Sequence, residues 1–138
     1  MKIVTFFNVK GGVGKTTLSI LTSLKLSKEN KKILLIDADT QANLTQFIYK
    51  VFHEDKTLFD ALIDNTTAKD LIIKSPLKNY SNIDLIPSDL SLSVLSEVLT
   101  TKTNREKTVW RWFKNNIETL KEYDYIFVDL SPSYDLIA

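Results

Sequence analysis

The sequence contains no cysteine, and His53 is the single histidine among its 138 residues. The absence of cysteine excludes a disulfide framework, a thiolate metal site and a cysteine nucleophile, and it is compatible with a reducing compartment. His53 lies in a polar stretch in which we identify no second metal-binding partner. We therefore expect His53 to be a solvated surface residue.

The sequence also lacks an excess of charge of one sign and long apolar runs. Its net charge of +1 gives no global reason to expect binding to nucleic acid or to a membrane, so a local patch would have to provide it. No apolar run approaches the roughly 20 residues of a membrane-spanning helix, and the N-terminus enters a predicted strand without a signal-peptide arrangement. With 43% hydrophobic and 25% charged residues, the composition is that of one globular domain, which we expect to be cytoplasmic.

The organising feature of the sequence is the stretch NVKGGVGKTT at residues 8–17, between an apolar run and a helical pattern that starts near Lys15. It is similar to the phosphate-binding pattern G-x-x-x-x-G-K-[ST], although Val9 stands where that pattern has its first glycine. Glycines at positions 11, 12 and 14 allow backbone N–H groups to close around phosphate oxygens. The helix that follows directs its N-terminal N–H groups and its positive dipole end at the same anion. The stretch therefore predicts a variant phosphate-binding loop, and the alternative is a glycine-rich turn without a ligand.

Three side chains of this loop have predicted roles at a nucleotide. Lys15 would contact the β- and γ-phosphates, the Thr16 hydroxyl would ligate Mg²⁺, and Thr17 would donate a further hydrogen bond to a phosphate. The order of strand, loop and helix that this motif demands is present in the sequence. The predicted nucleotide-binding residues are Lys10, Gly11, Gly12, Val13, Gly14, Lys15, Thr16 and Thr17.

Strand and helix patterns alternate along the chain. Strands are predicted over residues 2–7, 33–36, 82–87 and 125–128, and helices near residues 15–28, 58–63, 68–73, 88–100 and 105–121, with a loop over 101–104. The first strand is expected to be covered on both faces, because its apolar residues do not alternate with polar ones. This order argues for right-handed crossovers and hence for an α/β fold with a parallel sheet flanked by helices.

Three of the predicted helices have apolar faces, and the one near 88–100 is expected to turn Leu92, Leu95, Val98 and Leu99 inward. The helix near 15–28 is expected to turn Leu18, Ile20, Leu21, Leu24 and Leu26 toward the core. The helix near 105–121 is expected to bury Val109, Trp112, Phe113 and Leu120, with Asn116 as a polar interruption. Trp110 lies off this face, where it would serve a partner or cover a neighbouring helix.

A basic cluster lies in the same region of the sequence. Its members are Lys102, Arg105, Lys107, Arg111 and Lys114. Such a cluster is able to meet DNA phosphates, but Glu106 and Glu118 interrupt its charge. We therefore favour a solvated helix face.

Three aspartates follow apolar strands. Asp37 and Asp39 come at the end of the second predicted strand, and Asp129 comes at the end of the fourth. In open α/β sheets the carboxyl ends of the strands form the edge where ligands bind. A single aspartate at a strand end is a weak signal, and capping of the next helix is the alternative role for Asp37 and Asp39. Together with the loop, the three residues predict a nucleotide site at this edge.

The loop resembles the deviant Walker A motif of the ParA/MinD family of ATPases, in which the additional lysine, here Lys10, is the signature residue. The stretch DADTQ at residues 37–41 resembles the family's Asp-x-Asp-x-Gln motif, with Thr40 where relatives often have proline. The stretch IFVD at residues 126–129 resembles a Walker B strand, so the resemblance implies a sheet of the P-loop NTPase type. Because ParA/MinD proteins are longer, we expect residues 1–138 to be the N-terminal part of a single P-loop ATPase domain, truncated after the Walker B strand.

The resemblance also implies an ATPase that uses ATP and Mg²⁺ and forms an ATP-dependent homodimer. Lys15 would neutralise phosphate charge within its own subunit, whereas Lys10 would reach the nucleotide of the partner subunit. Asp39 would orient the attacking water, so the implied catalytic residues are Lys10, Lys15 and Asp39. Mg²⁺ would be held by Thr16, Asp37 and Asp129.

The biological role that the resemblance implies is plasmid or chromosome partition. Its implied partners are a ParB-like activator protein and non-specific DNA, the latter bound through segments beyond residue 138, and no membrane is implied. Gln41, Asn43 and the turn at residues 86–88 favour partition ATPases over the membrane-associated MinD branch. The alternatives are a MinD-like positioning ATPase and a truncated, non-hydrolysing nucleotide-binding or interaction module.

Overall fold

The structure is a computed structural model that describes residues 1–6, 13–39, 42–52, 55–88 and 102–130. Its strands form one parallel sheet in the order β1-β4-β2-β3. The strands are β1 (Lys2–Phe6), β2 (Ile33–Ala38), β3 (Ile83–Ile86) and β4 (Tyr125–Leu130). The helices are α1 (Val13–Lys28), α2 (Asn43–Ile48), α3 (Leu58–Asp64), α4 (Ala68–Leu71), α6 (Lys102–Asn115) and α7 (Ile117–Leu120).

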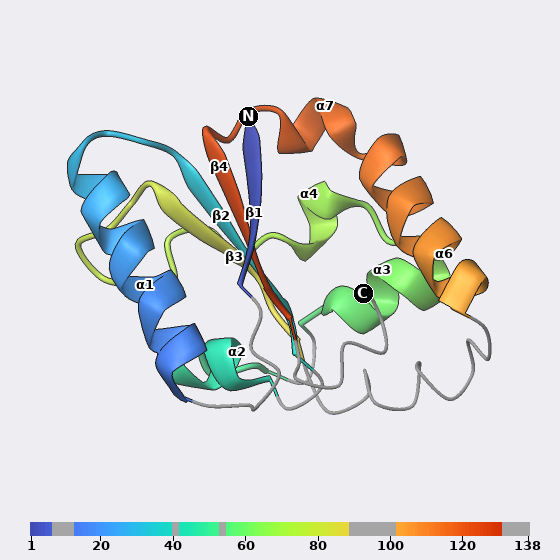
Figure 1. Ribbon diagram of the computed structural model, residues 1–138, viewed down its shortest axis with the longest axis horizontal. Coiled ribbons are helices and arrows are strands. Elements are labelled where there is room, and N and C mark those ends of the chain that lie inside the picture. The colour runs from blue at the N-terminus through green and yellow to red at the C-terminus, as the bar shows by residue number, and fades with distance from the viewer. Residues whose placement is uncertain (7–12, 40–41, 53–54, 89–101, 131–138) are drawn as a thin grey trace.

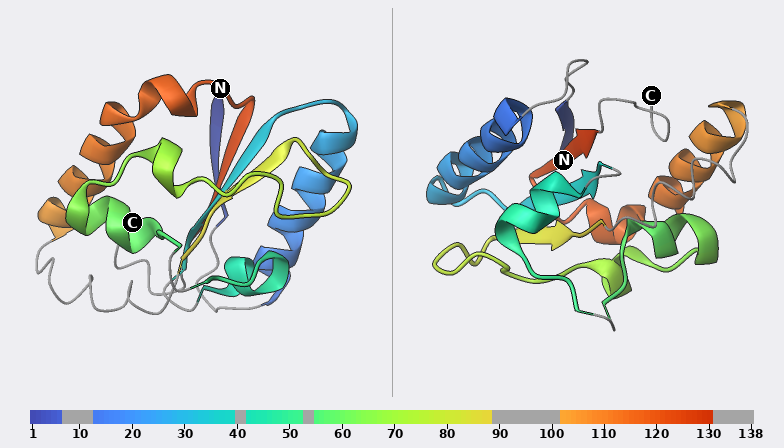
Figure 2. Two further views of the ribbon diagram at one scale, coloured as in Figure 1. Left: turned by 180° about the vertical axis from the view of Figure 1, so that it is seen from behind. Right: turned by 90° about the horizontal axis from the view of Figure 1, so that it is seen from below.

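Helices cover both faces of the sheet (Figures 1 and 2). On one side, α1 and α2 pack on Ile33 and Leu35 of β2, and on the other side the cluster formed with α3, α4, α6 and α7 contains Leu34 and Ile36. Successive side chains of a strand point to opposite faces, so β2 contributes to two cores at once. This arrangement confirms the predicted α/β fold with a parallel sheet flanked by helices. Among the described residues, no helix combines the length and the hydropathy needed to cross a bilayer.

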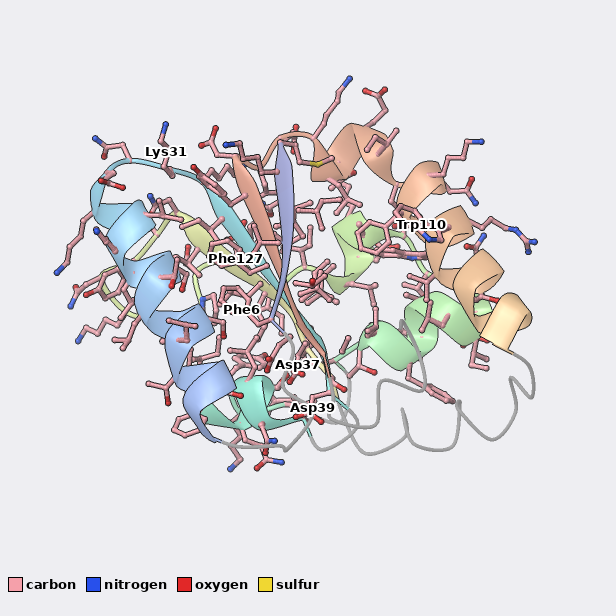
Figure 3. The ribbon with its side chains drawn as sticks, viewed as in Figure 1. Phe6, Lys31, Asp37, Asp39, Trp110 and Phe127 are labelled. Carbon is pink, nitrogen blue, oxygen red and sulfur yellow. The ribbon has the colours of Figure 1, made fainter. Side chains whose placement is uncertain are left out.

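The expectation that the first strand is covered on both faces is wrong. β1 lies at an edge of the described sheet, where it pairs with β4, and Ile3 and Val4 are 45% and 38% exposed. Only its end is anchored in the core, because the half-buried Phe6 ring packs edge-on against Phe127 at 5.2 Å between centroids (Figure 3). A continuous apolar run thus does not by itself separate a central strand from an edge strand.

The expected apolar face of α1 is wrong for Leu18 and Leu21, which are more than half exposed. Small hydroxyl residues face the sheet instead, and these are Thr16, Ser19, Ser23 and Ser27. Two of these hydroxyls are satisfied inside the helix, since Ser19 donates to the Thr16 carbonyl at 2.8 Å and Ser23 donates to the Ile20 carbonyl at 2.7 Å. The other two donate to side chains outside it, Thr16 to Asp129 and Ser27 to Asn82. Ile20, Leu24 and Leu26 flank this polar stripe and are partly buried, as expected.

The helix predicted over 105–121 is divided in two. α6 begins at Lys102, within the predicted loop 101–104, and the helix breaks at Asn116 before α7. The Asn116 side chain does more than interrupt the apolar face, because it links two helices. Its Oδ1 accepts a hydrogen bond from the Ala68 N–H at 2.8 Å, and its Nδ2 donates to the Trp112 carbonyl at 2.8 Å. The start of α4 is thereby tied to the end of α6. Trp110 is 68% exposed, in agreement with its predicted position off the apolar face.

The remaining predictions differ from the structure mostly at element ends. The second and third strands and α3 are confirmed within one or two residues, whereas α2 was not predicted. α4 stops at Leu71 rather than at residue 73, because Ile73 instead forms an antiparallel bridge with Leu85. Residues 89–100 of the helix predicted over 88–100, and His53, lie outside the described residues.

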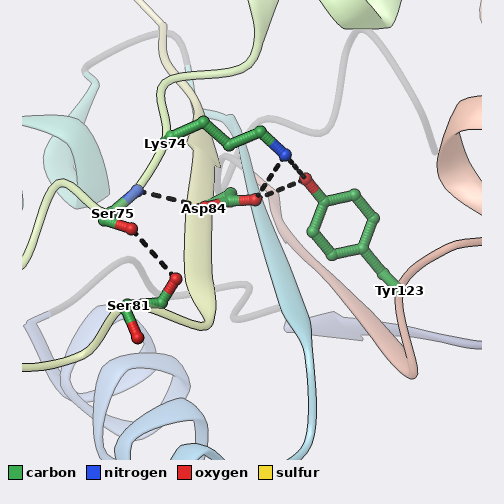
Figure 4. Close-up of polar contacts among 5 residues, drawn as sticks. All are labelled: Lys74, Ser75, Ser81, Asp84 and Tyr123. Atoms are coloured by element: carbon green, nitrogen blue, oxygen red, sulfur yellow. Dashed lines mark hydrogen bonds and ion pairs between the residues drawn. The ribbon is translucent and has the colours of Figure 1, made fainter.

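A buried carboxylate on β3 joins three parts of the chain (Figure 4). Asp84 accepts a hydrogen bond from the Tyr123 hydroxyl at 2.6 Å and forms an ion pair with Lys74 at 3.1 Å. The backbone N–H of Ser75 donates to its other oxygen at 3.0 Å. Burial, together with the neighbouring Asp84 carboxylate, raises the pKa of Tyr123 above its ordinary range. The cluster fastens the segment after α4 and the turn before β4 to the outer strand of the sheet.

Candidate functional site

The candidate site lies at the carboxyl edge of the sheet, next to the first turn of α1. Asp37 of β2 and Asp129 of β4 are register partners on neighbouring strands. Backbones of neighbouring strands are about 4.8 Å apart, so the two carboxylates are brought close together. Figure 3 shows Asp37 and Asp39 at this end of the sheet, near α2 and the start of α1.

Thr16 and Asp129 meet although they are separated by 113 residues. The Thr16 hydroxyl donates to Asp129 Oδ2 at 3.3 Å, and both side chains are about 1% exposed. Thr16 reaches this position because α1 starts at Val13, directly at the edge where β4 ends. A hydroxyl and a carboxylate oxygen are hard ligands of the kind that Mg²⁺ prefers.

Asp37 is held by three hydrogen bonds. Thr45 donates to its Oδ2 twice, from the backbone N–H at 2.8 Å and from the hydroxyl at 2.6 Å, and the Asp39 N–H donates to its Oδ1 at 3.0 Å. Burial raises the pKa of Asp37 to about 7, the hydrogen bonds oppose that rise, and the nearby Asp129 carboxylate adds to it. A cation bound at this edge would favour the ionised form of Asp37.

Asp39 is fully buried in the turn that leads into α2. Its Oδ2 accepts a hydrogen bond from the Asn43 side chain at 2.8 Å, and its carbonyl accepts from the Ala42 N–H at 2.9 Å. Ala42 makes the turn possible by adopting a left-handed conformation with φ of 55°. The Ser88 hydroxyl, at the end of β3, donates to the same carbonyl at 3.0 Å.

The structure describes only part of the predicted loop. Lys10, Gly11 and Gly12 lie outside the described residues, and Val13, Gly14 and Lys15 are described as the backbone of the first turn of α1. Thr17 is exposed on α1, while Thr16 is buried against Asp129. Of the predicted site residues, the structure therefore brings together Thr16, Asp37, Asp39 and Asp129.

The described oxygen donors fit a magnesium ion that is shared with a phosphate. No group of three or more His, Cys, Asp or Glu side chains in the described part of the chain forms a metal cluster by itself. Mg²⁺ is usually held by one or two carboxylates together with substrate phosphates and water, rather than by a complete protein cage. Thr16 and Asp129 beside a helix N-terminus match that requirement.

Two residues of this edge were not predicted as part of the site, Thr45 and Ser88. Thr45 lies in α2, a short helix in a segment without a clear helical period, so no local pattern indicates that its hydroxyl bonds to Asp37. Ser88 follows the third strand and therefore lies at the same carboxyl edge, which was a usable signal. Ser88 was predicted only to end the turn at residues 86–88 and to start the helix predicted over 88–100.

Comparison with known proteins identifies the family of this chain. A family model described as an AAA domain matches residues 1–138. The sporulation initiation inhibitor protein Soj of Bacillus subtilis is 33% identical over 139 residues, which cover 99% of this chain and 52% of Soj. The chain spans between 40% and 52% of the length of curated relatives such as Soj.

Two solved structures contain a nucleotide and are similar in both sequence and fold. A putative plasmid partition protein of Borrelia burgdorferi bound to AMPPNP is 36% identical, with a TM-score of 0.73 over 95% of this chain and 54% of that protein. A Cyanothece McdA variant in complex with ATP is 32% identical, with a TM-score of 0.81 over 96% of this chain and 48% of that protein. With the match of the whole chain and the acidic edge beside α1, the chain belongs to the AAA domain family and, within it, to the ParA/MinD P-loop ATPases.

Proposed function

We propose that this chain forms the phosphate- and magnesium-binding part of a ParA-type ATPase that hydrolyses Mg-ATP in plasmid or chromosome partition. The observation that carries the proposal is the contact between Thr16 and Asp129 at 3.3 Å, in a buried position at the start of α1. This is the placement that a hydroxyl and a carboxylate need in order to share Mg²⁺ with nucleotide phosphates. The AMPPNP and ATP bound to the two similar structures support the same choice of ligand.

The charge of the edge explains why cations are needed. The described charged side chains there are the aspartates 37, 39 and 129, and a triphosphate would add further negative charge. Lys15, in the first turn of α1, would neutralise the phosphates, and backbone N–H groups of the glycine-rich loop would surround them. Thr17 would add a hydrogen bond to a phosphate.

Thr16 and Asp129 would hold Mg²⁺, with Asp37 in the surrounding hydrogen-bond network. When bound, the ion neutralises charge on the phosphates and orients them for in-line attack by water. Asp39 would orient that water, because it is the second carboxylate that the turn after β2 fixes at this edge. Lys10 would reach the nucleotide of a second subunit, so that ATP binding becomes a signal for dimerisation.

Nucleotide binding tests the proposal first. We expect AMPPNP to bind the chain in the presence of Mg²⁺, measured by calorimetry, and to bind at least about tenfold more weakly after Thr16→Ala or Asp129→Asn, since such ligands act together with the phosphates. Thr22→Ala, on the same helix but hydrogen-bonded to the Leu18 carbonyl, is the matched control. Equal binding by all four proteins would contradict the assignment.

Hydrolysis is tested in the protein that the complete reading frame encodes, hereafter the extended protein. We expect Lys10→Ala and Asp39→Ala to abolish ATP turnover while Asp39→Ala still binds the nucleotide, because Asp39 acts on the water rather than on the phosphates. Turnover that persists in both variants would contradict the catalytic roles of Lys10 and Asp39. An absence of turnover in the unchanged extended protein would favour a nucleotide-binding module that does not hydrolyse ATP.

Partition is tested by binding to DNA. We expect the extended protein to be retained on DNA of arbitrary sequence when ATP is present, and to be released as salt is raised, because phosphate contacts dominate such binding. An absence of retention at low salt would count against a role in partition.

A further inference from the structure

The Thr45 side chain occupies the middle of a hydrogen-bonded ring at the acidic edge. It is 1% exposed, and its hydroxyl donates to Asp37 Oδ2 at 2.6 Å while accepting from the Ser88 N–H at 3.0 Å. The donor and one acceptor position of this hydroxyl are therefore both used. One side chain of α2 thus joins the end of β2 to the end of β3.

The ring closes through the backbone of Asp39. Ser88 Oγ donates to the Asp39 carbonyl at 3.0 Å, and the Asp39 N–H donates to Asp37 Oδ1 at 3.0 Å. Thr45, Asp37, Asp39 and Ser88 are all at most 1% exposed. Ser88 thus donates to both Thr45 and Asp39, and each of these two residues donates to Asp37. Both oxygens of the Asp37 carboxylate are therefore engaged, which fixes its rotation.

We infer that Thr45 is a positioning residue of the magnesium site, because its hydroxyl fixes the Asp37 carboxylate and ties it to the end of β3 through Ser88. The inference rests on the proposed function, in which Asp37 belongs to the network around the ion. Groups that orient the residues next to a metal contribute about 10- to 100-fold to metal affinity. Thr45 does so from a helix that also carries Asn43, the partner of Asp39.

The test compares Thr45→Val, which keeps the shape but removes the hydroxyl, with Thr45→Ser, which keeps the hydroxyl. Thr22→Val on α1 is the matched control, because the Thr22 hydroxyl bonds to the Leu18 carbonyl away from the ring. The first measurement is the rate of hydrogen exchange at the Ser88 amide, which is monitored by NMR in the absence of nucleotide. The second is the Mg²⁺ concentration at which AMPPNP binding reaches half of its maximum.

We expect Thr45→Val to speed exchange of the Ser88 amide at least about tenfold and to raise the Mg²⁺ midpoint about 10- to 100-fold. Thr45→Ser should restore both quantities to within about threefold of the unchanged chain, and Thr22→Val should alter neither. A Thr45→Val protein with an unchanged Ser88 amide and an unchanged Mg²⁺ midpoint would overturn the inference. If Thr45→Val does not fold, Thr45→Ala, which also lacks the hydroxyl, replaces it, and an unchanged Mg²⁺ midpoint in that variant is then the contradicting result.

The two measurements separate this inference from the proposed function. If the unchanged chain binds no AMPPNP with Mg²⁺, the proposed function fails, and the role of Thr45 at a magnesium site fails with it, whatever the exchange rates show. If the unchanged chain binds the nucleotide but Thr45→Val and Thr45→Ser bind it equally well at every Mg²⁺ concentration, the proposed function stands and the positioning role is wrong.

Discussion

The Asp37 carboxyl group is buried at the end of β2 and accepts three hydrogen bonds, yet burial still raises its pKa to about 7. The pKa of the folded chain is therefore above the ordinary value of 3.8. The folded state binds this proton more tightly than the unfolded state does. The resulting contribution to stability is complete below pH 3.8 and is lost as the pH rises through about 7.

Asp37→Asn should remove this pH dependence. Between pH 5 and pH 7, without Mg²⁺, the unchanged chain should lose about 2 kcal/mol more of its free energy of unfolding than the variant, at about 1.4 kcal/mol per pH unit. Urea unfolding at the two pH values measures the difference. Parallel pH profiles for the two proteins would mean that Asp37 does not titrate in this range.

Tyr123, just before β4, provides a second buried partnership, with Asp84 of β3. Tyr123→Phe removes the hydroxyl that donates to Asp84 at 2.6 Å, and we expect a loss of about 1 to 3 kcal/mol in the free energy of unfolding. Because the pKa of Tyr123 is raised, its contribution should be present below pH 10 and fall as the pH rises further. Tyr80→Phe, on a partly buried ring elsewhere, is the control. Equal stability of both variants would show that Asp84 is satisfied without Tyr123.

At the scale of single elements, α1 was predicted as a helix, but the residues predicted to form its buried face were partly wrong. Leu18 and Leu21 followed the apolar spacing, but the small residues Ser19 and Ser23 are the ones that are buried. Serines bury well here because their hydroxyls bond to carbonyls of the preceding turn. A pattern of apolar residues alone does not contain that information. α2 was missed for a related reason, since its buried residues Leu44, Thr45 and Ile48 make tertiary contacts that a local pattern does not contain.

The buried face of α1 leads to a packing test. Ser23 is fully buried, so Ser23→Leu should overpack the contact with the sheet and lower the free energy of unfolding by about 1 to 3 kcal/mol. Leu21→Ser, at a position that is 58% exposed, should change it by less than about 0.5 kcal/mol. Chemical denaturation measures the free energy of unfolding of both variants. A larger loss in Leu21→Ser than in Ser23→Leu would mean that α1 buries the face expected from the apolar spacing.

At the scale of the whole molecule, the acidic edge was predictable and the ring behind it was not. The loop motif and the aspartates at strand ends indicated that Thr16, Asp37, Asp39 and Asp129 share one edge, because parallel strands end on the same side. The ring requires β2 and β3 to be neighbours and α2 to fold back on them, and both features are set by tertiary packing. The exposure of β1 was missed because strand order is not contained in a local pattern.

The edge strand β1 carries apolar side chains that the described part of the chain leaves uncovered. Ile3 is 45% exposed, and it lines a surface cavity with Trp110 and Ile117. Exposed apolar edge strands favour association between molecules, so we expect this chain to self-associate as its concentration rises, as seen by sedimentation velocity. Ile3→Lys should reduce the association, whereas Ile63→Lys, on α3 at a residue that is 44% exposed, should not. Equal association of both variants would place the contact elsewhere.

The most direct test of a magnesium site at the acidic edge uses Mn²⁺, which prefers the same oxygen ligands and broadens the NMR signals of nearby nuclei. Mn²⁺ would be titrated into the chain with AMPPNP. The amide signals of Thr16, Asp37 and Asp129 should broaden first, while those of Lys32 and Asp124, at the other end of the sheet, should stay sharp. Broadening that starts elsewhere, or that spares Thr16 and Asp129, would contradict the account.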